Sequence, residues 1–420
     1  LTHKYANNEL VNYNYTYNAN GSITEVRENG TVVARYSYDD LNQLEWYGDR
    51  NTGLYKQFVY DNAGNIQSVK ESQLQTSGWY PGTLIKEYTY SYGDTNWKDK
   101  LTSFDGDTIT YDANGNPLNY RDGMSFTWVN GRILNSITNG NTTIAMKYDS
   151  NGMRTQKGST KYYYDSSNKL IGMVNGNNTL LFYYDEDDTP TSFTHNGTMY
   201  YYVKNIQGDI VKIVNQNGTV VANYTYDAFG KKLDITNSSG ATITSASSVA
   251  LLNPLRYRGY VYDEETGLYY LQSRYYDPLV GRFLNADDTD YIGTTGTALS
   301  GNLFAYCEND PVNNTDPLGF FKIRRWMIST PIDILLMLIP GIGAAFAPVK
   351  SIAKSFGKAA LKAKLKTPLV SFIKFIAKNA SKLIKGFKKI VTKIPSVGKK
   401  LASKIPVNKL VKMIAGATSS

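Results

Sequence analysis

The side chains that could do acid–base, nucleophilic or metal chemistry are distributed very unevenly along the 420 residues. The chain has two histidines, His3 and His195, and one cysteine, Cys307, so no internal disulfide and no cysteine-based zinc site can form. Residues 321–420 contain no His, Glu, Cys or Tyr and a single aspartate, Asp333. Metal-assisted or acid–base chemistry needs carboxylate or imidazole groups. We therefore expect no turnover enzyme, cofactor or metal in this segment.

The charge of the chain changes at the same place. Residues 1–320 carry 24 Lys or Arg and 35 Asp or Glu, whereas residues 321–420 carry 21 and 1, which gives net charges of −11 and +20. Such asymmetry indicates two parts with different partners. The basic part is expected to bind an anion, which is nucleic acid, an anionic membrane or the acidic remainder of its own chain.

Residues 1–245 have the pattern of an array of β-hairpins. Tyrosines alternate with polar residues, as at Tyr13, Tyr15 and Tyr17, which places them on one face of a strand. Turn sequences of the form Tyr-Asp/Asn-x-x-Gly recur at Tyr17, Tyr60, Tyr111, Tyr148 and Tyr226, and weaker copies without the glycine occur at Tyr38, Tyr164 and Tyr184. Glycine and asparagine tolerate the positive φ that tight hairpins need, and recurrence at this spacing predicts a repeat array. The aspartate of each repeat is interpreted as a turn-forming residue.

This array resembles the YD-repeat (RHS-repeat) family over roughly residues 1–320. The resemblance implies a mainly β fold, in which an antiparallel sheet spirals into a hollow shell with a plug at one end. About 245 residues are too few to close such a shell. Because the chain also begins at Leu1 in mid-pattern, we expect it to be the C-terminal portion of a longer protein.

The resemblance is most specific between residues 254 and 319. The sequences PLRYRGYVYDEETGLYYLQSRYYDPLVGRFLNADD (254–288) and NLFAYCENDPVNNTDPLG (302–319) are very similar to the RHS repeat-associated core domain. In that family, variable C-terminal domains follow a terminal Asp-Pro-x-Gly, which is Asp316–Gly319 here. Three domains are expected: the repeat array at 1–245, the core domain at 246–320 and a variable cationic tail at 321–420.

The resemblance also implies self-cleavage just after this element, between Phe320 and Phe321, by paired aspartates. In such a pair one carboxylate activates water while a protonated partner polarises the scissile carbonyl. The candidate carboxylates are Asp263, Asp277, Asp287 and Asp316, and the candidate arginines that orient them are Arg274 and Arg282. This chain departs from the family pattern at two positions. Many relatives have Leu where this chain has Phe320, and many carry Pro after the aspartate that corresponds to Asp287, where this chain has Asp288. The alternative interpretation is that these acids hold turns and ion pairs within a plug.

The tail is predicted to be helical and amphipathic. Over residues 369–391, at 100° per residue, the apolar side chains fall in a stripe about 120° wide, and lysines fill the opposite arc. This pattern is typical of a helix that lies in a membrane interface. The predicted membrane-binding residues are Phe372, Ile373, Ile376, Leu383, Ile384 and Phe387 on the apolar face and Lys374, Lys378 and Lys385 on the basic face. Upstream, the uncharged residues 334–349 fit a re-entrant segment or a buried helix at least as well as a membrane span.

Three functions follow from these patterns. The first is a bacterial polymorphic toxin, secreted or at the cell surface, whose shell delivers a pore-forming or permeabilising tail to the anionic membrane of a target cell and which is paired with a cognate immunity protein. The second is a surface or wall-associated protein whose tyrosines bind carbohydrate and whose tail serves as an anchor. The third, binding of nucleic acid, is disfavoured because phosphate binding needs charge and not the sixteen apolar residues of 334–349.

Overall fold

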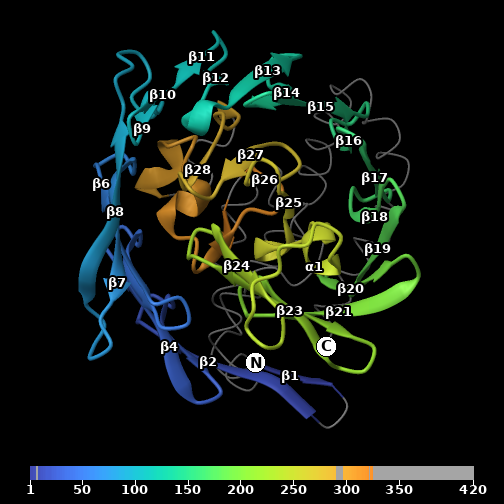
Figure 1. Ribbon diagram of the computed structural model, residues 1–420. Helices are drawn as coiled ribbons and strands as arrows, with labels where there is room; N and C mark the ends of the chain where they lie inside the picture. Colours follow the sequence, from blue (N-terminus) through green and yellow to red (C-terminus); the bar gives the residue numbers. More distant parts are fainter. Residues whose placement is uncertain (6–7, 290–296, 321, 325–420) are drawn as a thin grey trace, which may run out of the picture. The chain divides into compact units, whose positions relative to one another are not determined.

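The computed structural model of the protein describes residues 1–5, 8–289, 297–320 and 322–324. All of them belong to the compact unit Leu1–Ala344. Within this unit nearly every strand pairs with its neighbours in the sequence, and the sheets are antiparallel. In Figure 1 the strands of two long sheets surround the yellow and orange segment that follows them.

The first sheet runs in chain order along the blue and cyan part of Figure 1. Its strands are β1 (Thr2–Tyr5), β2 (Asn8–Tyr17), β3 (Ile23–Glu28), β4 (Thr31–Tyr38), β5 (Leu44–Asp49), β6 (Leu54–Tyr60), β7 (Ile66–Leu74), β8 (Pro81–Ser91), β9 (Ser103–Phe104) and β10 (Asp107–Thr108).

The second sheet continues in chain order through the green part. Its strands are β11 (Thr110–Tyr111), β12 (Pro117–Asn119), β13 (Ser125–Val129), β14 (Ile133–Asn139), β15 (Thr142–Tyr148), β16 (Arg154–Lys157), β17 (Thr160–Tyr164), β18 (Leu170–Asn175), β19 (Asn178–Tyr184), β20 (Pro190–His195), β21 (Thr198–Lys204), β22 (Ile210–Asn215), β23 (Val220–Tyr226) and β24 (Lys232–Thr236).

The repeat turns share one geometry, which explains the Tyr-Asp-x-x-Gly sequence. In the turn after β6, Tyr60 pairs with Ile66, and Asp61 Oδ1 accepts the backbone N–H groups of Ala63 and Asn65, each at 2.9 Å. The glycine of the motif, Gly64, has φ of 77°, which only glycine adopts readily. The interpretation of the aspartate as a turn-forming residue is confirmed here.

The weaker repeats keep the same turn without glycine. At the position of the glycine they have Asn42, Asn168 and Asp188, with φ of 62°, 64° and 58°. Asparagine and aspartate tolerate this left-handed conformation better than other non-glycine residues. Tyr17, Tyr38 and Tyr60 therefore mark successive two-strand units, 21 and 22 residues apart.

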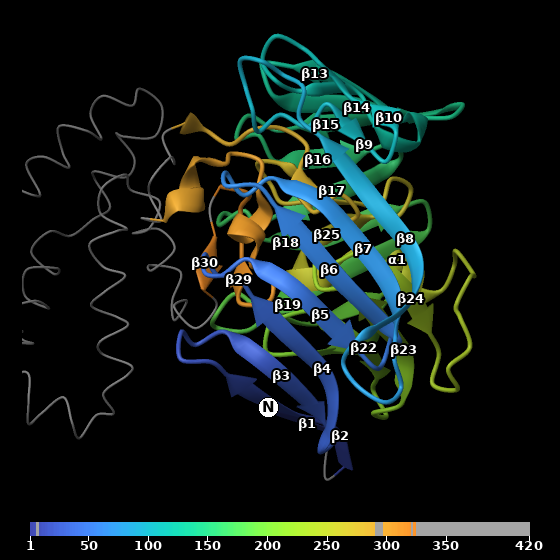
Figure 2. The ribbon, with the colours of Figure 1, turned by 90° about the vertical axis from the view of Figure 1, so that its left-hand side faces the viewer.

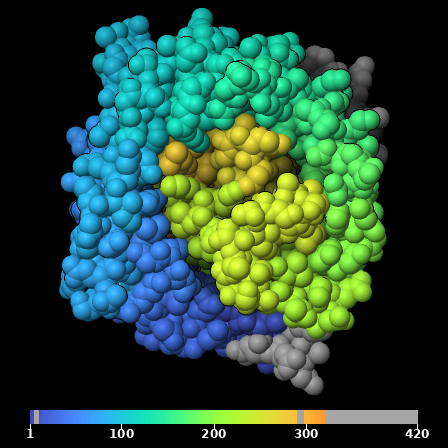
Figure 3. All heavy atoms as spheres, in the orientation of Figure 1, coloured from blue at the N-terminus to red at the C-terminus, as the bar shows by residue number. Residues whose placement is uncertain are grey.

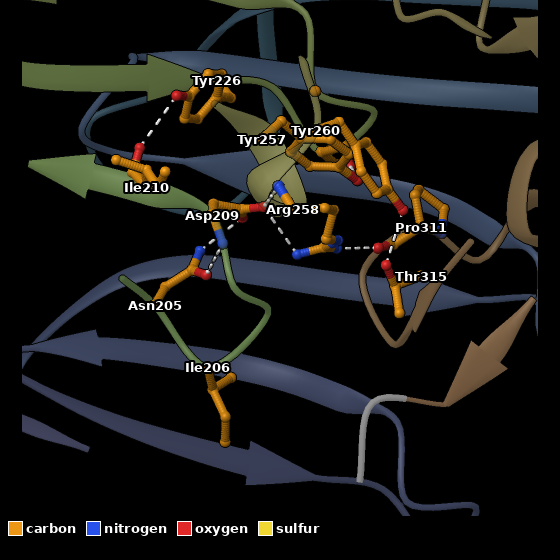
Figure 4. Close-up of polar contacts among 12 residues, drawn as sticks. Asn205, Ile206, Asp209, Ile210, Tyr226, Tyr257, Arg258, Tyr260, Pro311 and Thr315 are labelled. Atoms are coloured by element: carbon orange, nitrogen blue, oxygen red, sulfur yellow. Dashed lines mark hydrogen bonds and ion pairs between the residues drawn. The ribbon is translucent and has the colours of Figure 1, made fainter. Parts of the chain in front are cut away.

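The repeat tyrosine links each unit to the one before it. The hydroxyl of Tyr60 donates to the carbonyl of Leu44 at 2.7 Å, and Leu44 is the first strand residue after the preceding repeat turn. Tyr226 does the same with Ile210 at 3.0 Å (Figure 4). Tyr38, Tyr92, Tyr164 and Tyr184 donate in the same way to Ile23, Ile66, Arg154 and Leu170. Each tyrosine thus buries an aromatic ring while its polar end is hydrogen-bonded.

The segment after the array forms the centre of the unit, and Figure 3 shows its orange atoms in a hollow between blue, cyan and green strands. Its elements are α1 (Val249–Leu252), the 3₁₀ turns η2 (Tyr257–Gly259), η4 (Ala298–Gly301) and η5 (Tyr306–Asn309), the four-stranded sheet β25 (Val261–Asp263), β26 (Leu268–Tyr270), β27 (Tyr275–Asp277) and β28 (Arg282–Phe283), and the pair β29 (Asn314–Thr315) and β30 (Ile323–Arg324). Aromatic packing dominates: the rings of Tyr276 and Tyr306 stack with centroids 4.1 Å apart. No described helix is long and apolar enough to cross a membrane.

Buried ion pairs join this central segment to the array. Arg258 donates to Asp209 Oδ1 at 3.0 Å and to the carbonyl of Pro311 (Figure 4). Arg154, which is fully buried, forms a bidentate pair with Asp263. The core segment therefore lies inside the strands and is joined to them by buried charges.

The first strands of the array meet its later part. His3 Nε2 is hydrogen-bonded to the carbonyl of Lys204, and the hydroxyl of Tyr15 accepts from the backbone of Ile206 at 3.1 Å. A cavity of about 340 Å³ remains beside this junction, lined by tyrosines and by Asp49 and Asp209. The first and later strands of the array therefore meet through side-chain contacts, and the expectation that about 245 residues are too few to close a shell stays a prediction.

Candidate functional site

The Asp-Pro-Leu-Gly element forms a tight, buried turn. Asp316 is 2% exposed, and its Oδ1 accepts the backbone N–H groups of Gly319 at 2.9 Å and Phe320 at 3.0 Å. Gly319 has φ of 74°, and a Cβ there would lie 2.7 Å from Ser273 Oγ and 3.0 Å from the carbonyl of Leu271. Glycine is required at this position by both conformation and space.

The carbonyl groups of this turn face two donors. Ser273 Oγ donates to the carbonyl of Leu318 at 2.6 Å and contacts that of Gly319 at 3.0 Å. Arg274 Nε also donates to the Gly319 carbonyl. The backbone immediately before the expected cleavage point is therefore held and polarised by a hydroxyl and a guanidinium.

Two of the four candidate aspartates converge on the same arginine. Arg274 Nη2 lies 2.7 Å from Asp287 Oδ2 and 3.6 Å from Asp316 Oδ2. Burial raises the pKa of Asp287 to about 6 and that of Asp316 to about 7, and the Asp287 charge adds to the upward shift of Asp316. Arg274 opposes both shifts. Both carboxyls are therefore shifted toward the protonated form, which is the direction that a pair acting as acid and base in one reaction requires.

The other two candidate aspartates lie elsewhere in the core. Asp263 is paired with Arg154 and Lys157, and although burial acts in the opposite direction, these two cations hold its pKa below the usual value. Asp277 accepts from Arg121 Nε at 2.6 Å. Both are engaged by array cations, so the structure does not bring them to the Asp316–Gly319 turn.

Arg282, the second candidate for orienting a carboxylate, lies opposite Asp277 on the neighbouring strand, but its guanidinium hydrogen bonds go to other residues. Its guanidinium donates to Asn65 Oδ1 at 3.1 Å, the Tyr92 hydroxyl at 3.2 Å and the carbonyl of Asp99 at 2.6 Å. It joins the core to the turn after β6. Of the two arginines, Arg274 alone meets the candidate carboxylates among these contacts.

A cavity of about 250 Å³ lies beside the turn. Its lining includes Ser273, Arg274 and Phe320, together with Tyr275 and Asn285. Water can therefore approach the backbone of the Asp316–Gly319 turn from this side. Among the described residues no group of three or more His, Cys, Asp or Glu side chains is arranged to hold a metal ion.

Other predicted residues lie outside the described part of the chain. These are Phe321 on the far side of the expected cut, the hydrophobic residues 334–349, and the predicted membrane-binding residues Phe372, Ile373, Lys374, Ile376, Lys378, Leu383, Ile384, Lys385 and Phe387. Sequence reasoning missed Ser273, although it directly precedes Arg274 in the core motif. It also missed Glu308, whose carboxylate meets Lys322 just after the turn.

Comparisons with known proteins agree with this architecture. The Teneurin YD-shell family model matches residues 174–312. The chain is 36% identical over 304 residues to the tRNA nuclease WapA of Bacillus subtilis and 34% identical over 307 residues to the tRNA3(Ser)-specific nuclease WapA of Bacillus spizizenii. Each match covers 69% of this chain and 12% of the relative, so the chain spans about an eighth of these proteins' length.

A more distant relative is the double-stranded DNA deaminase toxin A of Burkholderia cenocepacia, 25% identical over 361 residues, with 76% of this chain and 23% of the relative covered. Among solved structures, TcdB2-TccC3-Cdc42 superimposes with a TM-score of 0.58 at 18% identity, and the Tc holotoxin pore of Photorhabdus luminescens with 0.57 at 18%. These matches cover 74% and 75% of this chain and 17% of each other chain. At this identity the similarity concerns the fold.

Proposed function

The chain belongs to the YD-repeat (RHS-repeat) family, and from this premise we propose that it is the C-terminal part of a bacterial polymorphic toxin. Residues 1–245 and 246–320 are the array and core of the carrier, and residues from 321 onward are its effector part. A secreted or cell-surface location follows from that role. One observation carries the proposal: the change of net charge from −11 to +20 falls at the turn on which Asp287, Asp316 and Arg274 converge.

Self-cleavage at this turn is the chemistry that the geometry supports best. In the singly protonated pair, the ionised carboxylate takes a proton from water, and the water oxygen attacks the scissile carbonyl carbon. The protonated partner donates its proton to the carbonyl oxygen as the tetrahedral species forms. The first carboxyl then gives the proton it took from water to the leaving nitrogen, and its partner takes back the hydroxyl proton, so that the C–N bond opens to a carboxylic acid and an amine. The proposed bond is Phe320–Phe321, one residue after the carbonyl that Ser273 and Arg274 hold.

Asp316 would also hold the peptide group that precedes this bond, because its Oδ1 accepts the N–H of Phe320. Arg274 contacts both carboxylates and the Gly319 carbonyl, and so holds these three groups close to one another. Positioning of this kind accounts for a large share of catalysis when reacting groups belong to one chain.

For the effector we propose action on membranes. Residues 321–420 have 20 more basic than acidic side chains, which attract anionic lipid at about 1 kcal/mol for each cation near the surface. The apolar side chains of 369–391 repeat at helical spacing and supply area for insertion. Membrane disruption needs no catalytic residue, which suits a segment with a single carboxylate.

Leakage of dye from anionic vesicles tests this proposal. We expect the purified chain to release dye from vesicles rich in phosphatidylglycerol and to leave phosphatidylcholine vesicles intact. A matched variant with Phe372, Ile376 and Phe387 replaced by Ser keeps the charge, and we expect it to bind anionic vesicles weakly and release little dye. Intact vesicles with the unmodified chain, cut and uncut, would exclude membrane action.

A second candidate is action on nucleic acid, and the names of the relatives favour it. WapA relatives are tRNA nucleases and the Burkholderia relative is a DNA deaminase toxin. A net charge of +20 also suits phosphate binding, with affinity that falls steeply with salt. Incubation of the chain with tRNA and with duplex DNA separates the two candidates, because binding without leakage supports the second and leakage without binding supports the first.

The wall-associated alternative makes a different prediction. If the array binds carbohydrate through its tyrosines and the tail is an anchor, expression of the chain inside a bacterium should be tolerated. A toxin should depolarise or kill the cell, and a cognate immunity protein should restore growth. The loss of membrane potential on expression is the measurement that distinguishes a toxin from an anchored binding protein.

A further inference from the structure

The residues that follow the Asp-Pro-Leu-Gly turn are held by contacts of their own. Lys322 Nζ lies 2.5 Å from Glu308 Oε2. The Glu308 side chain is 9% exposed, and Thr297 Oγ1 donates to the same carboxylate oxygen at 2.5 Å. The pair is therefore a partly desolvated contact on the effector side of the turn, unlike an ion pair between two solvated side chains.

The backbone after Lys322 is held as a strand. β30 pairs antiparallel with β29, so that Ile323 lies opposite Thr315 and Arg324 opposite Asn314. Figure 2 shows β29 and β30 together at one side of the described unit. Asn314 and Thr315 are each 3% exposed, so β29 is a fixed edge against which an extended segment docks.

The turn that carries Glu308 has an unusual backbone. Three consecutive residues other than glycine, Cys307, Glu308 and Asn309, have φ of 53°, 51° and 61°. Such conformations persist where the surrounding structure holds them, and they gather at functional sites. Asn309 Nδ2 supplies that hold, donating to Gln43 Oε1 at 2.9 Å and to the carbonyl of Gly64 at 2.7 Å. The array thereby holds the residue next to Glu308 in place.

We propose that Glu308 and β29 form a recognition subsite for the first residues of the effector part. Glu308 selects a basic side chain at position 322, and β29 binds the backbone of 323–324. The inference rests on the proposed self-cleavage, because it makes this segment the substrate on the leaving side of the bond. Glu308 is a positioning residue and takes no part in proton transfer.

The two sides of the bond are then held separately. Ser273, Arg274 and Asp316 fix residues 318–320. Glu308 and β29 fix residues 322–324. Anchoring on both sides restricts the bond to one position relative to the carboxylates, which accelerates a reaction within one chain. The contacts of residues 322–324 with Glu308 and β29 do not depend on the peptide bond. After cleavage the new N-terminal segment therefore stays bound to the core until the Glu308–Lys322 contact opens.

Charge exchange in the full chain tests the subsite. We expect Glu308→Gln and Lys322→Glu each to slow the appearance of the cut fragments at least 10-fold, and Lys322→Arg to cut at nearly the normal rate. The double variant Glu308→Lys with Lys322→Glu should recover most of the rate. Lys86→Gln, which opens the ion pair with Asp105 elsewhere on the array, is the control and should change nothing. Equal cutting rates in all variants at unchanged melting temperature would overturn the proposal.

A second measurement separates this inference from the cleavage itself. In the chain with Asp316→Asn, hydrogen exchange of the backbone amides of residues 322–324 is measured with and without Glu308→Gln. Faster exchange in the Glu308→Gln protein supports the subsite even if the unmodified chain never cuts, in which case only the proposed cleavage fails. Unchanged exchange overturns the subsite whatever the chain does at Phe320.

Discussion

Arg154 and Asp263 form a fully buried ion pair between the array and the core, with Arg154 Nη1 2.5 Å and Nη2 2.9 Å from the two carboxylate oxygens. Removing one partner leaves the other charge buried, which costs about 3–5 kcal/mol. We expect Asp263→Asn to lower the free energy of unfolding by that amount in urea titrations. Lys70→Met, which removes an exposed pair with Glu87 at 3.8 Å, should change it by less than about 0.5 kcal/mol. Equal effects of the two substitutions would contradict the account.

The repeat tyrosines offer a second test. Tyr60→Phe removes the hydrogen bond to the carbonyl of Leu44 and leaves the ring in place. We expect a loss of about 1 kcal/mol in unfolding free energy, because the buried carbonyl loses its side-chain donor. Tyr163→Phe is the matched control, since Tyr163 is 49% exposed and should tolerate the change. The inter-repeat link would be refuted if both variants melted at the temperature of the parent chain.

The turn at Gly319 should not accept a side chain. Gly319→Ala places a Cβ within 2.7 Å of Ser273 Oγ in a left-handed backbone, so we expect the turn to move and self-cleavage to slow by a factor of at least 10. Gly301→Ala is the control, because nothing lies within 4 Å of a Cβ at that position. The measurement is the yield of fragments against time on denaturing gels. Equal yields from both variants would contradict the claim that the position of the Gly319 carbonyl matters for cleavage.

The buried carboxylates predict a direction for pH dependence. Because burial raises the pKa of Asp316 to about 7, the folded chain keeps a proton that the unfolded chain releases near pH 4. Stability should therefore fall as pH rises from about 4 to about 7. Asp287→Asn blocks the proposed cut and removes one cause of the raised Asp316 pKa, while burial still acts. In that background we expect Asp316→Asn to flatten the decline in stability between pH 4 and pH 8. Parallel curves of unfolding free energy against pH for the two proteins would show that the pKa of Asp316 is not raised in the folded chain.

Much of the fold could be predicted from the sequence because its signals are local. Period-two tyrosines and the turn after Tyr60 depend on residues within one hairpin, and the structure confirms both. The sequence also indicated the weaker repeats that lack glycine. It did not explain why the turn survives there, which is that Asn42 and Asn168 adopt the positive φ in place of glycine. The first strands meet the later part of the array through contacts such as that of His3 with Lys204, about 200 residues apart. A local sequence pattern carries no signal for such contacts.

The candidate site shows the same division. From the sequence we expected a boundary at Asp316–Gly319, with Asp287 and Arg274 among the candidate residues. The sequence could not separate them from Asp263 and Asp277, because the cations that engage those two, such as Arg154 with Asp263, come from distant strands of the array. Ser273 was missed because a single serine has no distinguishing spacing.

The central claim is that the chain is divided at this turn by Asp287 and Asp316, and mass spectrometry of the purified full chain tests it most directly. After incubation near pH 6.5 we predict two fragments, one ending at Phe320 and one beginning at Phe321, and an intact chain in Asp287→Asn and in Asp316→Asn. An unmodified chain that keeps its full mass, or variants that are cut at the same bond and rate, would contradict the account.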